Sequence, residues 1–392
     1  MLKPHFWIFI LVLRLIPASA QLENPIFNGT FNSEIINAIP EKICSDLHPE
    51  YNPNFPFMAL ANAPEKWGVQ VLHYFKNNEY MEAHNPGLTL FGTQITTGTK
   101  RSFQNNKSHV YLGIMANFPF GGTQKTQFFP LVQFQHTFNH KHHLILGTLH
   151  GNTRHNLYEP LYNYELNLSQ PFEYGIQHLY KSKYFDSDLW LDWRQLAIAS
   201  ISQQEIISFG WSSKIKLNPL SPKHKFSIPL SSLVYHQGGE SLSVGKPIAN
   251  KWNGSIGIRY DINNQFRFES VAFGSQDFSP KRITSFKDGH AWYNQIHVNP
   301  LGKHQLVLSH YYAEEFFAPF GPNLFLSEQV GNPYKFDNYR NFLMARYQWM
   351  GALIPEKCIF DFRLEPIWHI EKQQFAFSAG FYVKYVLGTE LY

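Results

Sequence analysis

The sequence predicts an all-β fold, a transmembrane antiparallel β-barrel of about 16 strands (16–18), and three observations support this fold class. Apolar and polar residues alternate with a period of two over most of residues 87–387. Aromatic residues make up 17% of the chain and charged residues only 16%, against about 25% in soluble domains. Beyond the N-terminus, no apolar run approaches the roughly 20 residues of a helical span. Only alternate residues of a spanning strand meet lipid, so this combination is typical of a barrel.

The N-terminal 20 residues have the features of an export signal. Lys3 gives a short positive region, residues 6–16 an apolar one, and Ala18-Ser19-Ala20 a small-residue cleavage site. Residues 21–65 show no alternation and are rich in Asn and Pro, so three interpretations stay open: a periplasmic lead-in, a plug inside the barrel, or a flexible tail. The expected organisation is a signal peptide at 1–20, this segment at 21–65 and the barrel at 66–392.

The C-terminal segment 374–387 gives the clearest strand. Successive side chains of a strand point to opposite faces. One face is apolar, the other carries small and polar residues, and the apolar face consists of Phe375, Phe377, Ala379, Phe381, Val383, Tyr385 and Leu387. The terminal Tyr392 is out of phase with this face unless Gly388 marks a bulge. We expect this segment to be the last strand of the barrel.

Comparable alternation predicts sixteen strands along the chain, with a further run at 66–75 left unassigned. They lie at 87–97, 109–119, 127–138, 141–149, 160–168, 172–181, 186–199, 203–217, 225–236, 252–262, 264–273, 290–298, 302–312, 339–350, 357–370 and 374–387. An even count puts both termini on the periplasmic side. The long connections at 237–251, 274–289 and 313–338 then fall outside, and short turns at 263–264, 299–302 and 351–356 inside. Residues 150–159 are long for an inner turn.

The alternating segments, the export signal and the run ending in Tyr392 resemble the outer-membrane β-barrel proteins of Gram-negative bacteria, in the porin-like size range. The resemblance is architectural and identifies no specific family. It implies a location in the outer membrane of a Gram-negative bacterium. The implied partners are membrane lipid and lipopolysaccharide, with other outer-membrane or periplasmic proteins as further candidates. The formal net charge of +4 supports no nucleic-acid partner.

The charges on the predicted inner face are nearly balanced in sign, which argues against strong ion selectivity. Two interpretations stay open: a transverse field across a water-filled lumen that sorts solutes, or a salt-bridge network around a plug. The candidates for the constriction are Asp192, Arg194, Arg259, Asp261, Arg267, Glu269, Arg340, Arg346, Asp361, Arg363, Glu365 and Lys384, and Glu165 is expected beside them. Tryptophans near strand ends are expected in the interfacial girdles: Trp190, Trp193, Trp211, Trp252, Trp292, Trp349 and Trp368.

No catalytic residues, metal site or cofactor are predicted. Membrane-embedded outer-membrane lipases and lipid A deacylases place a His two residues before the catalytic Ser, and none of the 19 His here has Ser at that offset. Clustered imidazoles at His140, His142 and His143 and carboxylates at Asp186, Asp188 and Asp192 contain metal-ligand types. A polar turn and solvated charge are the favoured interpretations, since neither cluster has the spacing of a known ligand loop.

Cys44 and Cys358 are the only cysteines, and both are expected near the periplasmic rim. Two alternatives stay open. In the oxidising periplasm they would form a disulfide that ties the N-terminal segment to the wall. Free thiols are favoured, because Cys358 shares its parity with the outward Phe360.

These observations favour a porin-like channel for small hydrophilic solutes. The alternative is a non-conducting barrel subunit of an outer-membrane export, assembly or surface-polysaccharide complex. We do not expect an enzyme.

Overall fold

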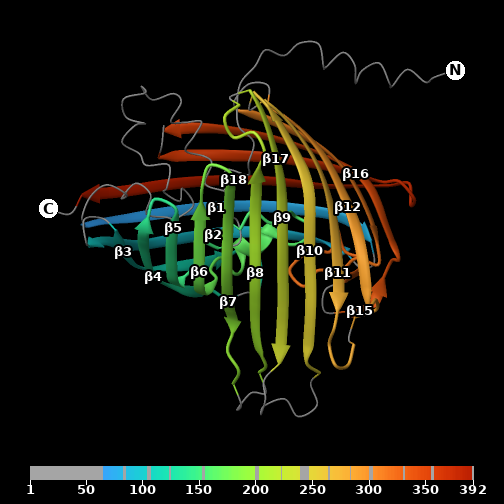
Figure 1. Ribbon diagram of the computed structural model, residues 1–392, viewed down its shortest axis with the longest axis horizontal. Coiled ribbons are helices and arrows are strands. Elements are labelled where there is room, and N and C mark those ends of the chain that lie inside the picture. Colours follow the sequence, from blue (N-terminus) through green and yellow to red (C-terminus); the bar gives the residue numbers. More distant parts are fainter. Residues whose placement is uncertain are drawn as a thin grey trace.

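The computed structural model describes residues 65–390, except for short gaps at 83–84, 104–106, 123–124, 152–154, 199–202, 222, 239–246, 264, 283, 300–302, 330–331 and 355–356. The expected export signal, the segment 21–64 with Cys44, and Tyr392 lie outside the described residues. Within them the chain forms one closed barrel of sixteen antiparallel strands (Figure 1). Each strand is hydrogen-bonded to the wall strands before and after it in the sequence, and the last strand pairs with the first. The predicted fold class is confirmed.

The first half of the wall consists of β1 (Glu65–Glu82), β2 (Asn85–Phe103), β3 (Ser108–Pro119), β4 (Gln127–Asn139), β5 (His142–Thr148), β6 (Tyr174–Lys181), β7 (Phe185–Gln195) and β8 (Glu205–Lys216). The second half consists of β9 (His224–Gly238), β10 (Ala249–Ile262), β11 (Phe266–Asp277), β12 (Asp288–Val298), β13 (His304–Glu314), β16 (Tyr339–Ile354), β17 (Cys358–His369) and β18 (Gln374–Glu390). A 3₁₀ helix, η2 (Tyr164–Leu168), and a small hairpin of β14 (Glu328–Gln329) and β15 (Asn332–Phe336) lie in two of the connections.

The barrel closes where β18 pairs with β1. Their register is regular from Lys66 opposite Glu390 to Glu79 opposite Phe377. Closure removes the unpaired strand edges that a bilayer does not tolerate. The register with β1 is regular through Gly388, so the bulge considered there is not formed.

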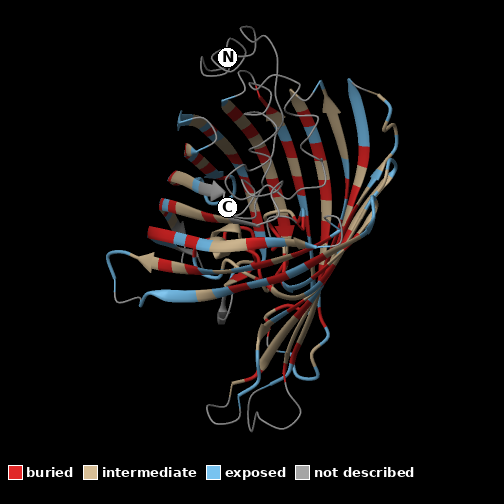
Figure 2. Cartoon of the chain, turned by 90° about the vertical axis from the view of Figure 1, so that its left-hand side faces the viewer, coloured by how far each residue is buried: buried red, intermediate tan, exposed pale blue. Residues whose placement is uncertain are grey.

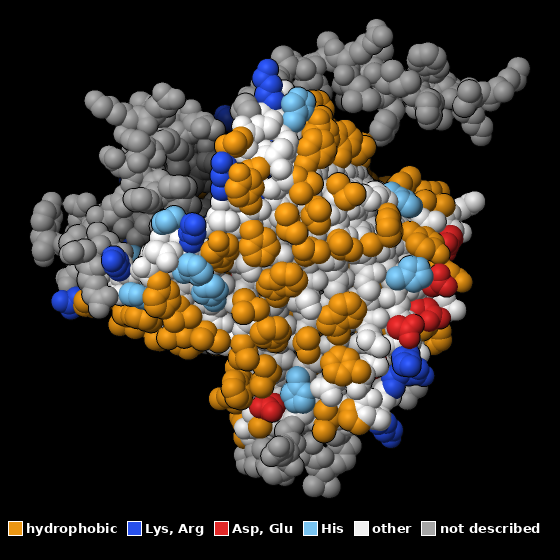
Figure 3. All heavy atoms as spheres, in the orientation of Figure 1, with side chains coloured by type: hydrophobic (Ala, Val, Ile, Leu, Met, Phe, Trp, Pro, Cys, Tyr) orange, Lys and Arg blue, Asp and Glu red, His pale blue; other side chains and the backbone are white. Residues whose placement is uncertain are grey.

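The two faces of the wall follow the predicted alternation. On β18, Phe375 and Phe381 are 55% and 45% exposed, whereas Ser378 and Tyr382 on the opposite face are 0% and 1% exposed. Buried and exposed residues alternate in the same way along other strands (Figure 2). The barrel face over β7–β12 is covered by hydrophobic side chains, with charged ones at its edges (Figure 3). The aromatic sides of the strands therefore point outward.

The count of sixteen is right, but one strand within it is wrong and one wall strand lies outside it. The run at 66–75, left as a possible extra strand, is part of β1, a full wall strand. The predicted strand at 160–168 is instead η2 and the turn before it. The alternation of Tyr162, Tyr164 and Leu166 therefore belongs to a folded connection. This removes the long inner turn at 150–159, because the whole of 149–173 becomes one connection between β5 and β6.

Both described ends of the wall lie at one end of the barrel, since Lys66 pairs with Glu390. We take this end as periplasmic. The connections 149–173, 239–248, 278–287 and 315–338 then begin at the outer end, while 263–265 and 299–303 are inner turns. No helix in the described part of the chain is long and apolar enough to cross a membrane.

Candidate functional site

Two outer connections fold back into the barrel and meet there. They are residues 149–173, called the first inner loop, and residues 315–338, called the second inner loop. Tyr162 and Phe320 form a parallel bridge, and the backbone N–H of Asn163 donates to the carbonyl of Phe320 at 2.6 Å. The rings of Tyr162 and Phe320 stack with centroids 5.7 Å apart. The two loops therefore form one layer inside the wall.

This layer packs against inward wall residues as a hydrophobic core. Leu157 and Leu161 of the first loop and Phe316, Phe320 and Phe325 of the second are buried. Their wall partners are inward residues of β5, β7, β9, β11, β12, β13, β16, β17 and β18: Ile145, Trp190, Leu233, Val271, Phe273, Ala291, Tyr293, Tyr311, Ala313, Phe342, Met344, Ile367 and Ala376. A core of this kind fills much of the lumen beside these strands.

Polar atoms of the wall hold the second loop as well. Asn253 donates to the carbonyl of Phe317 at 2.7 Å, and Tyr311 donates to that of Phe325 at 2.8 Å. The guanidinium of Arg340 donates to the carbonyl of Leu324 at 2.7 and 3.2 Å. Arg340 is therefore a loop anchor, and its side chain is almost fully buried.

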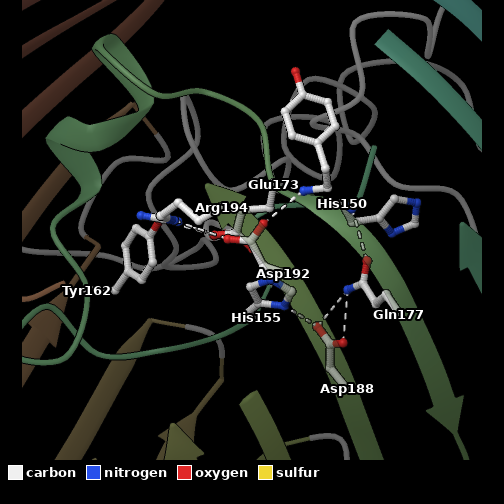
Figure 4. Close-up of polar contacts among 9 residues, drawn as sticks. His150, His155, Tyr162, Glu173, Gln177, Asp188, Asp192 and Arg194 are labelled. Atoms are coloured by element: carbon white, nitrogen blue, oxygen red, sulfur yellow. Dashed lines mark hydrogen bonds and ion pairs between the residues drawn. The ribbon is translucent and has the colours of Figure 1, made fainter. Parts of the chain in front are cut away.

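The first loop is fixed to β7 by a buried histidine, which lies between Asp188 of β7 and Glu173 at the end of the loop. His155 lies 2.8 Å from Asp188 through Nδ1 and 2.8 Å from Glu173 through Nε2 (Figure 4). Its ring stacks on Trp190 with centroids 3.6 Å apart. Gly210 of β8 leaves room for that tryptophan, since a Cβ there would lie 2.0 Å from the indole.

The carboxylates around His155 have further partners, which makes the cluster an extended network. Gln177 donates to both oxygens of Asp188 at 2.9 Å. Tyr162 donates to Glu173 at 3.0 Å, and Arg194 lies 3.3 Å from Glu173. Figure 4 shows Arg194 joining Tyr162 and Glu173. We call these residues the histidine latch.

Electrostatics keep His155 charged. Burial lowers its pKa, but the charges of Asp188 and Glu173 outweigh burial and raise the pKa of His155 to about 9. Burial raises the pKa of Glu173, yet His155 and then Arg194 bring that pKa below its ordinary value. Because both ring nitrogens of the imidazolium donate to carboxylates, the ring is not available as a general base. The latch is therefore a structural feature of the lumen.

On the side of β1, β16 and β17, a row of alternating charges fixes the first loop. Glu159 lies 2.5 Å from Arg346, which also contacts Glu365. Lys76 lies 3.2 Å from Glu365 and 3.1 Å from Glu165. We call Glu159, Arg346, Glu365, Lys76 and Glu165 the charge row. It joins two loop carboxylates to three strands of the wall.

A cavity of about 230 Å³ lies beside the charge row. Its lining includes all five residues of the row together with Arg363, Tyr80 and Tyr382 from the wall. Leu324 and Phe325 of the second loop also line it. The cavity is therefore enclosed by β1, β16, β17, β18 and both inner loops.

The remaining lumen candidates form separate groups. Arg259, Asp261, Arg267 and Glu269 form a balanced network beside the inner turn, with Asp261 2.9 Å from Arg259 and 2.7 Å from Arg267. On β17, Arg363 lies 2.5 Å from Asp361. On β7, Arg194 lies 3.1 Å from Asp192. Lys384 lies between Leu72 of β1 and Ile359 of β17 in the register.

Two sequence interpretations need correction. Trp190 is not a girdle residue, because its ring is buried against His155 in the lumen. It shares strand parity with Asp192 and Arg194, and this parity could have revealed its direction. Asp188 and Asp192 are both buried, so they are not solvated charge. Asp188 contacts His155 and Gln177, and Asp192 contacts Arg194. Asp186 pairs with Lys216 at 2.7 Å.

Sequence reasoning missed His155, Glu159, Glu173 and Lys76. His155 and Glu159 lie in 150–159, which was expected to be an inner turn. Glu173 lies in the predicted strand 172–181, and Lys76 lies just after the unassigned run at 66–75. Among the described residues, no group of three or more His, Cys, Asp or Glu side chains is placed to hold a metal ion. Cys358 is a free thiol with respect to the described residues. Its pairing with Cys44 stays a prediction.

Serine and histidine do meet, across neighbouring strands. On the outward face, Ser108 Oγ lies 2.8 Å from His136 Nδ1. Ser102 lies 2.9 Å from His109 in the same way on the inward face. The search for His two residues before Ser could not find these pairs, because cross-strand register joins residues far apart in sequence. A Ser–His contact is the arrangement that activates a serine nucleophile.

Solved structures similar to this chain are outer-membrane proteins of Gram-negative bacteria. OprD from Pseudomonas aeruginosa has a TM-score of 0.50 and 10% identity, covering 83% of this chain and 96% of that chain. OpdL from the same species has a TM-score of 0.50 and 8% identity, covering 84% and 100%. OccAB3 from Acinetobacter baumannii has a TM-score of 0.48 and 11% identity, covering 83% and 99%. At these identities the likeness concerns the fold, and it agrees with the predicted barrel.

None of the curated proteins matches the sequence. One family model does, described as lipid A 3'-O-deacylase-type, and it matches residues 66–391. The match spans the whole described wall, from β1 to β18. The chain therefore belongs to the lipid A 3'-O-deacylase-type family.

Proposed function

We propose that the protein is a porin-like channel for small hydrophilic solutes, with its narrowest point at the charge row. The observation that carries this proposal is an asymmetry of the lumen. The inner loops pack through an apolar core over much of the wall, whereas at β1, β16 and β17 they meet it through ion pairs beside a cavity. Water and polar solutes pass more easily along charged side chains than through an apolar core.

The mechanism is diffusion through this polar side of the lumen. Opposed carboxylates and cations set up a field across the path, and the low dielectric of the surrounding core makes that field stronger than in water. The row contains three carboxylates and two cations. Small polar solutes are therefore sorted by charge and dipole, and large ones are stopped by the loops.

Planar-bilayer recordings of the refolded protein test this proposal. We expect discrete conductance steps. Arg346→Gln removes one positive charge at the narrowest point, so the reversal potential in a salt gradient should shift toward cation preference. Lys303→Gln, which removes an exposed charge at an inner turn, serves as the control and should leave the potential unchanged. A folded barrel that stays silent would overturn the proposal and favour the alternative, a non-conducting subunit of an export, assembly or surface-polysaccharide complex.

A second candidate function is ester hydrolysis of a membrane lipid, which the name of the family favours. Within the barrel, the outward pair of Ser108 and His136 has the contact that such chemistry needs. His136 would take the proton from Ser108 as the hydroxyl attacks the ester carbonyl, and would give it to the alcohol oxygen as the ester bond breaks. Water would then hydrolyse the acyl-serine and release the fatty acid. The expectation that the chain is not an enzyme stays a prediction.

Hydrolysis of lipid A and of phospholipid by the refolded protein in mixed micelles tests this candidate. If the pair is catalytic, Ser108→Ala abolishes the release of fatty acid. Ser102→Ala, which changes the inward pair, leaves it intact. No release by the unaltered protein from either lipid would contradict the candidate.

A further inference from the structure

The charge row gives the cavity an alternating pattern of charge at short spacing. Arg346 contacts carboxylates on both sides, and Lys76 does the same. Glu365 is shared by the two cations, so these lie close to each other. At the two ends, Glu159 and Glu165 each contact one cation of the row.

The charged part of the lining is electrically balanced. With Arg363 added to the row, the lining has three cations, Lys76, Arg346 and Arg363, and three carboxylates, Glu159, Glu165 and Glu365, while Asp361, the partner of Arg363, lies outside the lining. A solute with a net charge would leave one charge of the site uncompensated in a partly buried position, which is costly. A solute that carries both charges keeps the balance.

The rest of the lining contains an apolar part beside asparagine and tyrosine side chains. Leu324 and Phe325 come from the second inner loop, while Met344 and Ile367 come from β16 and β17. These side chains belong to, or pack on, the hydrophobic core of the lumen. An apolar group that reaches them leaves water and gains the usual free energy of burial.

We propose that this cavity binds a small zwitterion with an apolar substituent, the chemical class of a neutral amino acid such as leucine. The ammonium of the solute lies against a carboxylate of the charge row, its carboxylate against a cation, and its apolar group on the side of Phe325 and Ile367. This inference deepens the proposed channel function, on which it rests for the route of the solute to the site.

Size limits the solute further. The cavity has about 230 Å³. At about 30 Å³ per molecule of liquid water, this is the space of seven or eight waters. A free amino acid fits this space, and a trisaccharide does not. The proposed site therefore selects by size, by paired charge and by the apolar group.

Calorimetric titration of the folded barrel in detergent measures binding without any need for conduction. We expect saturable binding of leucine, weaker binding of glycine, which lacks the apolar group, and weaker binding of free glutamate and lysine, which carry a net charge. Arg346→Gln removes a charged partner and should weaken leucine binding about 10–100-fold. Ile367→Trp fills the apolar part of the cavity and should abolish binding with the row intact. Ile359→Trp, on the same face of β17 but outside the cavity, should leave binding unchanged.

Conductance recordings then separate this inference from the proposed function. A barrel that conducts but does not bind leucine would contradict the inference and support the channel. The same holds if Ile367→Trp binds leucine with the affinity of the unaltered protein. A silent barrel that binds leucine saturably, and loses binding only in the cavity variants, would keep the site and overturn the channel. Equal binding of leucine, glutamate and a trisaccharide would show a hydrated cavity without selectivity, against the inference.

Discussion

Replacing His155 by Phe removes the charge of the histidine latch and keeps a ring on Trp190. Asp188 and Glu173 then lose the cation between them, although Gln177, Tyr162 and Arg194 still donate to them. The rise in the pKa of His155 from 6.5 to about 9 corresponds to about 3 kcal/mol of stabilisation. Removing one member of a buried ion pair costs about 3–5 kcal/mol, a range that agrees. The first inner loop should therefore open more readily in the variant.

Amide hydrogen exchange of residues 155–173 measures this opening. At about 1.4 kcal/mol per factor of ten, a loss of 3 kcal/mol makes exchange about a hundredfold faster. His304→Phe changes an exposed contact with Tyr347 at the inner end and serves as the matched control. It should leave exchange of this loop unaltered.

The effect should also depend on pH, with a definite sign. The folded-state pKa of His155 is raised, so its stabilisation is complete below about pH 6.5 and is lost as the pH rises through about 9. After correction for intrinsic exchange rates, loop opening in the unaltered protein should increase over this window, and His155→Phe should show no such increase. Less than a threefold change in exchange at pH 6, or the same pH dependence in both proteins, would refute the role assigned to the latch.

Two further predictions concern the wall and the second loop. Ile256→Arg places a charge on the outward face in the middle of β10 and should lower the free energy of unfolding by about 2–4 kcal/mol in urea titrations. Leu217→Arg, just past the end of β8, should cost at most about 1 kcal/mol, and equal effects would mean that this face does not meet acyl chains. Arg340→Ala removes the donors to Leu324 and should raise protease cleavage within 315–338, with a loss of about 2–3 kcal/mol. Exposed Arg282→Ala is its control, and an equally resistant loop would contradict the anchoring role.

Much of the wall could be predicted because lipid acts on alternate residues. The alternation from Phe375 to Leu387 was enough to predict the outward face of this strand, and β18 has that face outward. β1 was left unassigned because its outward face is partly polar. His73 and Thr93 are hydrogen-bonded to each other there at 2.7 Å, and Asn77 and Thr89 at 2.8 Å. Cross-strand hydrogen bonds offset the cost of these groups, and one strand's sequence does not show them.

The sequence by itself determined a barrel and its outward face, because those depend on local alternation. Its count of sixteen matched only because the false strand at 160–168 replaced β1 in the sum. Only the tertiary structure decided what fills the lumen. The contacts of His155 with Asp188 and of Glu159 with Arg346 join residues distant along the chain, and they exist because two loops turn inward. Alternation sets the direction of a side chain within a strand, but it contains no information about the path of a long connection, which depends on apolar surface and charges that meet only after the wall has closed.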